Sequence, residues 1–286
     1  MFVMKKLIAT LSAAVVASAG LLSLSACGTA EVTYSVSEDG TYYILSGVSG
    51  SKSALTSYEI PSSYDDGVHG ELPVQSIGDS AFMGTSLYRV SIPDTVTRIE
   101  NYAFAYSKIG SVDIPSSVTY IGYAAFASCT ALEEVVIPSS VTALGPYSFA
   151  YCTSLARADV QASVDTIYIG TFMGMVANDN TGIYTNTKLT EIHFPSTLRY
   201  LHRESISGNF LTDIYFDGTE YEWQEVQVFY AEERAVEDGE EGETEIVTVY
   251  LDEEQTIEYF SVDGMTIHCN DADLTYSGGQ IHITNK

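Results

Sequence analysis

Six consecutive segments of the chain repeat one pattern of apolar residues, and this repetition constrains the fold more than any other feature. Each segment begins at an aliphatic residue, and the first five are 22, 23, 23, 34 and 22 residues long. The starting residues are Leu87, Ile109, Leu132, Leu155, Leu189 and Leu211. A chain with such a period stacks its repeats into a solenoid in which each repeat contacts only its neighbours. Because solenoids present extended binding surfaces, the pattern favours a binding protein.

The pattern within each repeat predicts two short strands and a turn. Alternate aliphatic residues, as in Leu132–Ile137, point inward in a β-strand, and Pro138 ends that strand because proline lacks a backbone donor. The next apolar pair, as in Val141–Leu144, predicts a second extended run on the opposite side. Gly-x-x-Ala-Phe then predicts a tight turn into a short 3₁₀ or single-turn helix. The expected fold is a β-rich leucine-rich repeat solenoid with an internal aromatic ladder of Phe82, Phe104, Phe126, Phe149 and Phe172.

Both ends of the repeat array depart from the pattern. Residues 32–86 are expected to hold a β-hairpin cap, with Asp39-Gly40 as its turn, and a divergent first repeat. Residues 87–216 contain the leucine-rich repeats. Residues 217–286 are expected to form a C-terminal β cap with Trp223 as an aromatic plug. This cap is expected to contain short strands at 259–262, 266–269 and 280–284, and an acidic loop at 232–258 with twelve Asp or Glu against one Arg.

The first 26 residues have the features of a processing signal. Lys5 and Lys6 precede an apolar run from Leu7 to Leu22, and Leu-Ser-Ala then leads into Cys27. This order resembles a bacterial lipoprotein signal, which would be cleaved before Cys27 and leave residues 27–31 as a lipidated cysteine and short linker. The alternative is an ordinary secretory signal peptide. Lipidation predicts an extracytoplasmic protein anchored to the bacterial cell membrane or the outer membrane surface.

The formal net charge of −26 excludes one class of partner. Nucleic acid is not expected to bind, because phosphate recognition needs clustered Lys and Arg. Contact with a membrane is expected through the lipid anchor only. Residues Asn178–Gly182 and the region of Glu240 offer oxygen ligands for calcium, but neither has a complete loop signature. No metal or other cofactor is therefore predicted.

The cysteines and histidines do not predict a catalytic site. Cys129 and Cys152 each lie three residues after a ladder phenylalanine, where the packing favours buried thiols, although stacked strands lie close enough for a disulfide. No nucleophile-elbow, P-loop or zinc-protease motif occurs. His268 and Cys269 are adjacent, but adjacent residues on a strand point to opposite faces. No catalytic residue is predicted.

The repeat core resembles a known family. Ile-Pro-Ser-Ser-Val-Thr-x-Ile-Gly-x-x-Ala-Phe-x-x-Cys-x-x-Leu is nearly intact at Ile114–Leu132 and Ile137–Leu155. With the entry at Glu38–Tyr43 and the exit at Ile214–Trp223, these residues are similar to the BspA-type leucine-rich repeat family of bacterial surface proteins. The resemblance implies a non-catalytic scaffold that is exposed at the cell envelope and used for adhesion or protein–protein contact.

The outward positions of the first strand of each repeat are the candidate binding residues. They are Arg89, Ser91, Ser111, Asp113, Glu134, Val136, Arg157, Asp159, Glu191, His193, Asp213 and Tyr215. Six strands in register would line these residues along one face, large enough for a host or bacterial surface protein. Two interpretations stay open, a mixed-charge binding face and a face that is only solvated. The many tyrosines, including Tyr102, Tyr120, Tyr123 and Tyr147, support an alternative function as a carbohydrate-binding lipoprotein that holds glycans for uptake.

Overall fold

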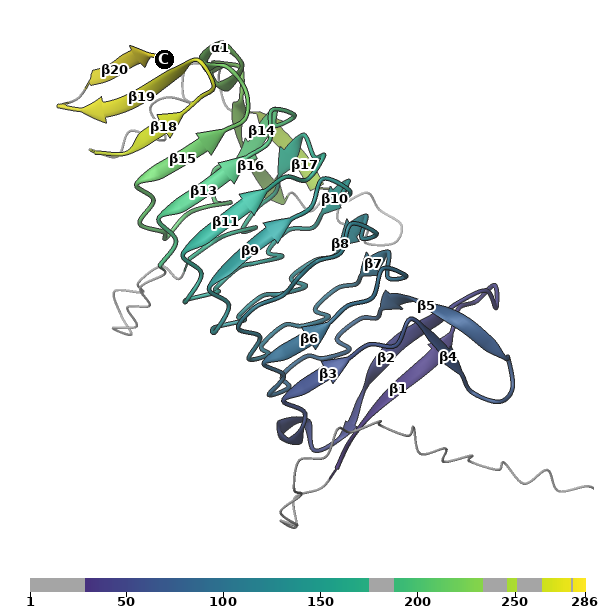
Figure 1. Ribbon diagram of the computed structural model, residues 1–286. Helices are drawn as coiled ribbons and strands as arrows, with labels where there is room; N and C mark the ends of the chain where they lie inside the picture. Colours follow the sequence, from purple (N-terminus) through teal and green to yellow (C-terminus); the bar gives the residue numbers. More distant parts are fainter. Residues whose placement is uncertain (1–28, 175–187, 234–245, 251–263, 279) are drawn as a thin grey trace, which may run out of the picture.

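The repeats stack as successive coils along one axis (Figure 1). The computed structural model describes residues 29–174, 188–233, 246–250, 264–278 and 280–286. Within these ranges the chain is rich in strands, and its helical segments are a 3₁₀ helix, Lys52–Ala54, and α1, Glu220–Gln224. The described residues therefore confirm a leucine-rich-repeat solenoid built of short strands. Residues 1–28, which include the signal and Cys27, lie outside the described residues.

Most of the described coils contribute strands to two sides of the solenoid. The first sheet contains β1 (Ala30–Val36), β2 (Tyr43–Gly50), β4 (Ser63–Asp65), β5 (Glu71–Ile77), β7 (Arg98–Ile99), β8 (Tyr120–Ile121) and β10 (Ala143–Leu144). The second contains β9 (Glu134–Ile137), β11 (Arg157–Val160), β13 (Glu191–Phe194), β15 (Asp213–Phe216), β18 (Thr266–His268), β19 (Ala272–Ser277) and β20 (Gln280–Asn285). A third contains β12 (Thr166–Ile167), β14 (Tyr200–His202), β16 (Gln227–Glu233) and β17 (Ile246–Tyr250). β3 (Ser57–Glu59) pairs with β6 (Arg89–Ser91).

The expected N-terminal hairpin is present. β1 and β2 pair antiparallel, and the turn between them has Gly40 at φ 72°, a left-handed conformation that glycine adopts without steric cost. Asp39 accepts hydrogen bonds from the hydroxyl groups of Ser37 and Thr41, which fixes the turn. β2 also pairs in parallel with β5, so the hairpin lies at the N-terminal end of the first sheet. The divergent first repeat also contains the antiparallel pair β4–β5.

The core is one continuous cluster along the axis, and its centre is the expected phenylalanine ladder. The five rings are buried and stack at centroid distances of 5.2, 5.0, 5.0 and 5.7 Å. Trp223 of α1 is fully buried and meets Phe216 edge to face at 5.3 Å. A capping box between Thr219 and Glu222 fixes the start of α1.

The turns around the ladder are not the 3₁₀ or helical turns that the sequence predicts. We call the five-residue segments centred on the ladder residues, such as 102–106, the Phe turns. In this segment Tyr102 and Tyr106 have φ of 56° and 59°. Their amides and that of Phe104 donate to carbonyls of the next repeat, while the amides of Ala103 and Ala105 bond locally. Alternate amides thus join neighbouring coils, which a 3₁₀ helix could not do because its amides all bond within the helix.

The cysteines fill packing positions beside the ladder. Cys129 and Cys152 are free, buried thiols. Their sulfurs donate to the carbonyls of Phe104 and Phe126, both at 3.2 Å, in the repeat before. A hydrogen bond with Cys129, together with burial, raises the pKa of the Cys152 thiol. The structure therefore has the buried thiols that packing favours.

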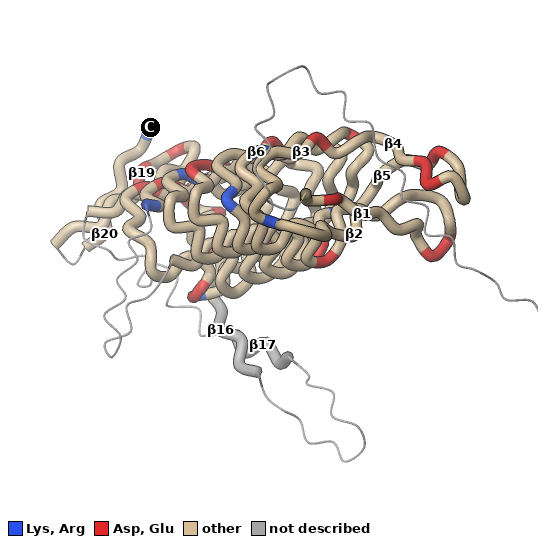
Figure 2. The backbone as a smooth tube through the Cα atoms, turned by 90° about the horizontal axis from the view of Figure 1, so that it is seen from below, with Lys and Arg blue, Asp and Glu red and all other residues tan. Residues whose placement is uncertain are grey.

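The C-terminal region differs from the prediction in two places. Ile246–Tyr250, inside the expected acidic loop, forms β17 and pairs with β16. β19, which was not predicted, lies between β18 and β20 and extends the second sheet. The expected strand at 259–262 lies outside the described residues, as do most of the acidic stretch and the candidate calcium ligands around Asn178 and Glu240. Along the described coils, acidic residues outnumber basic ones (Figure 2).

Candidate binding surface on the strand face

The outward side chains of β3, β6, β9, β11, β13, β15, β18 and β19, together with Ser111 and Asp113, form a surface that we call the strand face. All twelve predicted residues are exposed or half-buried there. From Ser111 onward the residues between them are buried, namely Val112, Val135, Ala158, Ile192 and Ile214. This alternation is what a strand with one buried side requires, so the predicted orientation is confirmed.

The strand face is not the run of six strands that the repeats predict. β6 pairs with β3, and Arg89 forms a single bridge with Ser111. Ser111 to Asp113 do not form a strand, and among the described residues Asp113 has no cross-strand partner. From β9 to β18 the strands pair in parallel and in register, and β19 follows antiparallel to β18. The predicted residues thus fall into a loosely paired N-terminal group and a tightly paired C-terminal group.

In the C-terminal group the register aligns outward side chains into two rows. The first row is Glu134, Arg157, Glu191, Asp213, Thr266 and Thr275. The second row is Val136, Asp159, His193, Tyr215, His268 and Asp273. The members on β18 and β19 were missed as site residues. The alternation Thr266-Ile267-His268 could have revealed those on β18, because it has the same outward–inward–outward order as Asp213-Ile214-Tyr215.

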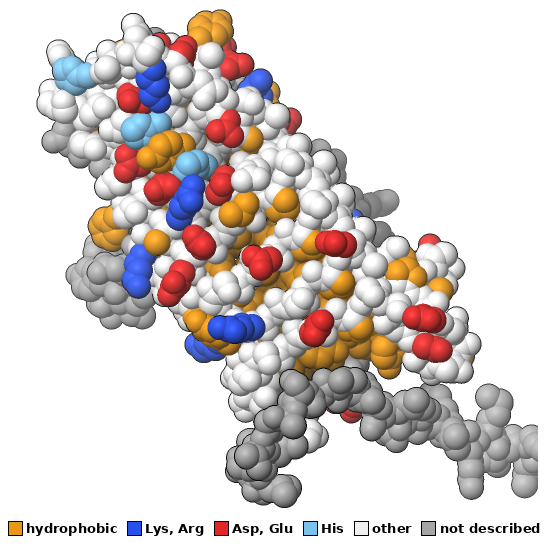
Figure 3. Space-filling view, viewed as in Figure 1, with side chains coloured by type: hydrophobic (Ala, Val, Ile, Leu, Met, Phe, Trp, Pro, Cys, Tyr) orange, Lys and Arg blue, Asp and Glu red, His pale blue; other side chains and the backbone are white. Residues whose placement is uncertain are grey.

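Three rings of the second row stack on one another across neighbouring strands. The rings of His193 and Tyr215 lie 4.3 Å apart at 13°, and those of Tyr215 and His268 lie 4.5 Å apart at 18°. Figure 3 shows pale-blue histidine side chains and orange side chains next to one another on this face, among charged side chains. Burial between its neighbours, together with the negative charge of Asp213, raises the pKa of the Tyr215 hydroxyl. The stack holds three polar-edged rings in a fixed order on the protein surface.

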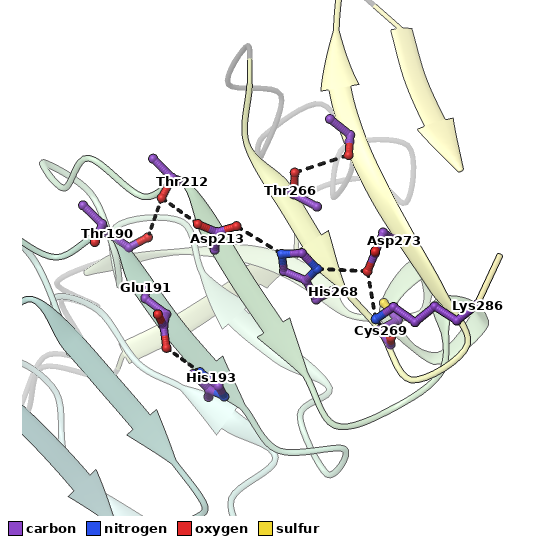
Figure 4. Close-up of polar contacts among 11 residues, drawn as sticks. Thr190, Glu191, His193, Thr212, Asp213, Thr266, His268, Cys269, Asp273 and Lys286 are labelled. Atoms are coloured by element: carbon purple, nitrogen blue, oxygen red, sulfur yellow. Dashed lines mark hydrogen bonds and ion pairs between the residues drawn. The ribbon is translucent and has the colours of Figure 1, made fainter. Parts of the chain in front are cut away.

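His268 links the last repeat to the C-terminal strands. Its Nε2 lies 3.0 Å from Asp213 Oδ1, and its Nδ1 lies 2.9 Å from Asp273 Oδ1 (Figure 4). Ionised carboxylates only accept hydrogen bonds, so both ring nitrogens donate when both contacts form. Lys286 Nζ also binds Asp273, at 2.8 Å. The hydrogen bond from His268 lowers the pKa of Asp213, and those from Lys286 and His268 lower the pKa of Asp273.

A second polar cluster adjoins the other end of the ring stack. Arg157 Nε binds Glu191 Oε1 at 2.7 Å, and the same oxygen lies 2.8 Å from His193 Nε2. Arg157 Nη2 is also 3.3 Å from His193 Nε2. Arginine can only donate and a carboxylate can only accept, so His193 Nε2 makes one of these two hydrogen bonds at a time. The ring therefore bonds to either Arg157 or Glu191 through this nitrogen.

Cys269 does not provide a reactive thiol at this surface. Cys269, next to His268, is buried on the other side of its strand, and burial raises its pKa to about 12. A thiol with this pKa is not a nucleophile near neutral pH. The described part of the chain holds no group of three or more His, Cys, Asp or Glu residues arranged for a metal ion. Nor does any helix in that part have the length and apolar character needed to cross a membrane.

A second aromatic surface lies on and beside the Phe turns. Tyr102 meets Tyr123 at 5.3 Å, and Tyr123 meets Tyr147 at 5.6 Å, in consecutive coils. Tyr102 and Tyr123 are 38 % and 39 % exposed. Tyr120, which the sequence grouped with them, lies on β8 under the guanidinium of Arg98, 4.0 Å from the ring centroid. Three of the four tyrosines are therefore brought together.

Comparison with known proteins shows which family the repeats resemble. Residues 75–179 match the model of the BspA type leucine rich repeat region in six copies. Solved structures with similarity include a leucine-rich repeat protein from Bacteroides capillosus, 33 % identical over 45 % of this chain and 93 % of that chain, with a TM-score of 0.39. Another is a leucine-rich repeat protein from Bacteroides ovatus, 24 % identical over 65 % of this chain and 54 % of that chain, with a TM-score of 0.45.

The T. pallidum leucine-rich repeat protein is also similar, at 22 % identity over 65 % of this chain and 82 % of that chain, with a TM-score of 0.44. The chain spans about half the length of the B. ovatus protein. No curated protein matches the chain. The repeated sequence, which matches in six copies, carries the assignment: the chain belongs to the BspA-type leucine-rich repeat family.

Proposed function

We propose that this chain is a non-catalytic scaffold of the cell envelope whose strand face binds a protein partner. The observation that carries the proposal is the pair of rows from β9 to β19, in which charged and aromatic side chains are held in fixed positions by backbone register. Ordered side chains lose little conformational entropy on binding, so such a surface favours specific recognition. Proteins of this family are commonly surface or adhesion proteins, which supports the same function.

The charges of the two rows indicate what kind of protein would fit. Arg157 and Lys286 are each bound to a carboxylate within the surface, whereas Glu134 and Asp159 are bound by no cationic side chain of the described residues. These two carboxylates flank Val136, which is 46 % exposed. A partner segment with basic residues beside an apolar one complements this arrangement.

The proposal is tested by capture of partners from cell-envelope and host-matrix extracts with residues 28–286 as bait. Asp159→Lys reverses a charge on the strand face, and Asp165→Lys makes the same change in the same repeat beside β12, on the other side of the solenoid. We expect a captured protein to be lost with Asp159→Lys and kept with Asp165→Lys. Equal capture by both variants would contradict binding at the strand face.

We further propose that Cys27 is lipidated and anchors the chain outside the cytoplasm. The apolar run before Leu-Ser-Ala-Cys27 supports this anchoring. Metabolic labelling with a fatty-acid analogue should label the wild-type chain and leave Cys27→Ser unlabelled. Equal labelling of both would contradict the assignment.

The β1–β2 hairpin and strands β18–β20 would cap the two ends of the solenoid, because the end repeats of a solenoid otherwise expose the core.

Binding of a glycan is the second candidate function. The contacts among Tyr102, Tyr123 and Tyr147 favour it, because exposed aromatic rings with hydroxyl groups offer both apolar and hydrogen-bonding contacts. A glycan array probed with the wild-type chain and with Tyr123→Ala tests it. Signals that the substitution abolishes would support a glycan site at these tyrosines, and an array without signals would remove the candidate.

A further inference from the structure

The second sheet ends in a strand with an open edge. β20 pairs antiparallel with β19 over six residue pairs, and no other strand of the described chain lies beyond it. All six of its residues are exposed. Natural edge strands are usually protected by lysine, proline or a bulge. Residues 280–285, Gln-Ile-His-Ile-Thr-Asn, contain neither lysine nor proline, and their pairing with β19 has no register shift.

The backbone of β20 has groups available for another strand. The amide of Lys286 donates to the carbonyl of Asp271 at 2.8 Å, which identifies these two residues as a hydrogen-bonded pair. In an antiparallel ladder such pairs alternate, so residues 282 and 284 also bond to β19. Ile281, Ile283 and Asn285 then direct their amides and carbonyls toward the open edge. This edge is therefore a template for one more antiparallel strand.

The side chains of this edge favour a second copy of the same chain. Ile281 and Ile283 lie on the inner face with Leu274, yet they are 36 % and 50 % exposed. The chain as a whole carries a net charge of −26, which opposes self-association at most surfaces. Residues 274–286 contain no Asp or Glu, so two copies of β20 meet without facing carboxylates.

We propose that β20 pairs antiparallel with β20 of a second copy, in a two-fold symmetric dimer centred on Ile283. This register gives the longest overlap of the outward-bonding residues Ile281, Ile283 and Asn285. It places His282 opposite Thr284 of the other copy and no charged side chain opposite a like charge. The exposed isoleucines of both copies then lie on one face and cover one another. Such an interface is isologous, because one strand supplies both sides.

Sedimentation of residues 28–286 over a range of concentrations tests the dimer. The wild-type chain should reach twice the monomer mass as concentration rises. Ile283→Pro should stay a monomer, because proline removes an amide that faces the open edge and leaves the bonds to β19 in place. Circular dichroism shows whether this variant keeps the fold. A wild-type chain that stays monomeric, or a dimer that survives Ile283→Pro, would overturn the proposal.

Cross-linking tests the register and does not depend on the folding of the proline variant. The three cysteines of the described chain are buried, so an introduced cysteine is the accessible thiol of that part. Hydrogen-bonded antiparallel pairs have Cα atoms about 5.5 Å apart, which suits a disulfide. Ile283→Cys should give a covalent dimer under mild oxidation, and the control Thr284→Cys should not. Cross-linking of both or of neither variant, or assemblies larger than a dimer, would contradict the proposed pairing.

Discussion

The two halves of the strand face show how strand register creates an ordered polar surface. In the N-terminal half, β3 and β6 pair over three residues and a single bridge continues to Ser111. In the C-terminal half, β9 to β19 pair without interruption, and their outward side chains form connected ion pairs and a ring stack. Both halves have outward polar residues from similar repeats. Only where consecutive strands are in register do these residues lie close enough to bind one another.

The opposite side of the solenoid compensates for the loose N-terminal half. There the first sheet runs through β5, β7, β8 and β10 in parallel pairs. The Phe turns add inter-repeat hydrogen bonds, and the phenylalanine ladder passes through both halves. The halves therefore share one core and differ in their surfaces.

Removing a ladder ring where the halves meet should have the largest effect. Phe126 stacks between Phe104 and Phe149 at 5.0 Å from each. Phe126→Ala should lower the free energy of unfolding by about 3–5 kcal/mol, because the buried ring leaves a cavity. Urea denaturation followed by circular dichroism measures this loss. The control Tyr106→Ala removes a ring that is 57 % exposed and should change stability by less than about 0.5 kcal/mol. Similar losses for both would contradict a shared core.

Removing the histidine that joins β15 to β19 should destabilise the C-terminal half alone. His268→Ala leaves Asp213 without its ring donor and Asp273 with Lys286 only. We expect a loss of about 1 kcal/mol, smaller than for a fully buried charged pair because these side chains are partly exposed. Hydrogen exchange should show faster opening of β18 to β20 than of β9. Arg89→Ala in the N-terminal half is the matched control, and an equal effect of the control would remove the distinction between the halves.

The stability of the fold at acidic pH should depend on the same carboxylates around His268. The pKa values of Asp213 and Asp273 are lower in the fold than the ordinary value of 3.8. A carboxyl group of this kind stabilises the fold above its ordinary pKa, and the contribution is lost as pH falls through the folded value. Asp213→Asn should therefore make stability less dependent on pH below about 4, as measured by thermal unfolding at a series of pH values. Identical profiles for wild type and variant would contradict the proposed pairing with His268.

The smallest effect is expected for a substitution in a Phe turn, because these turns are alike in both halves. Ser128 has φ 58°, and Gly84, at the equivalent place in an earlier repeat, has φ 69°. Glycine adopts this conformation without steric cost, so replacing the serine should relieve backbone strain. The resulting gain in stability is reduced because glycine has greater conformational freedom in the unfolded chain. Ser128→Gly should raise the melting temperature slightly, by an amount equivalent to about 0.5 kcal/mol. A lower melting temperature would show that the serine side chain stabilises the fold by more than the backbone strain destabilises it.

Much of this fold could be predicted from the sequence. Regular spacing identified the ladder from Phe82 to Phe172, and period-two alternation identified the outward residues of the strands. Local patterns did not reveal that the Phe turns avoid a 3₁₀ helix, because their amides bond to other repeats. They also did not show that Ser111 to Asp113 leave the sheet, since Val112 and Val135 follow the same pattern.

The cluster on β18 and β19 could not be predicted because its members come from distant parts of the chain. His268 and Asp213 are separated by 55 positions and meet only because β18 pairs with β15. Lys286 reaches Asp273 through the β19–β20 hairpin. Such contacts depend on strand order, which apolar periodicity does not specify.

Site-specific photo-crosslinking on living cells tests the central claim most directly. A photoreactive amino acid at Val136 probes the C-terminal half of the strand face, and one at Tyr106 probes the Phe turns with similar exposure. If the strand face is the binding surface, the probe at Val136 should cross-link to a discrete protein and the probe at Tyr106 should not. Cross-links from Tyr106 alone would contradict the account and move the binding surface to the Phe turns.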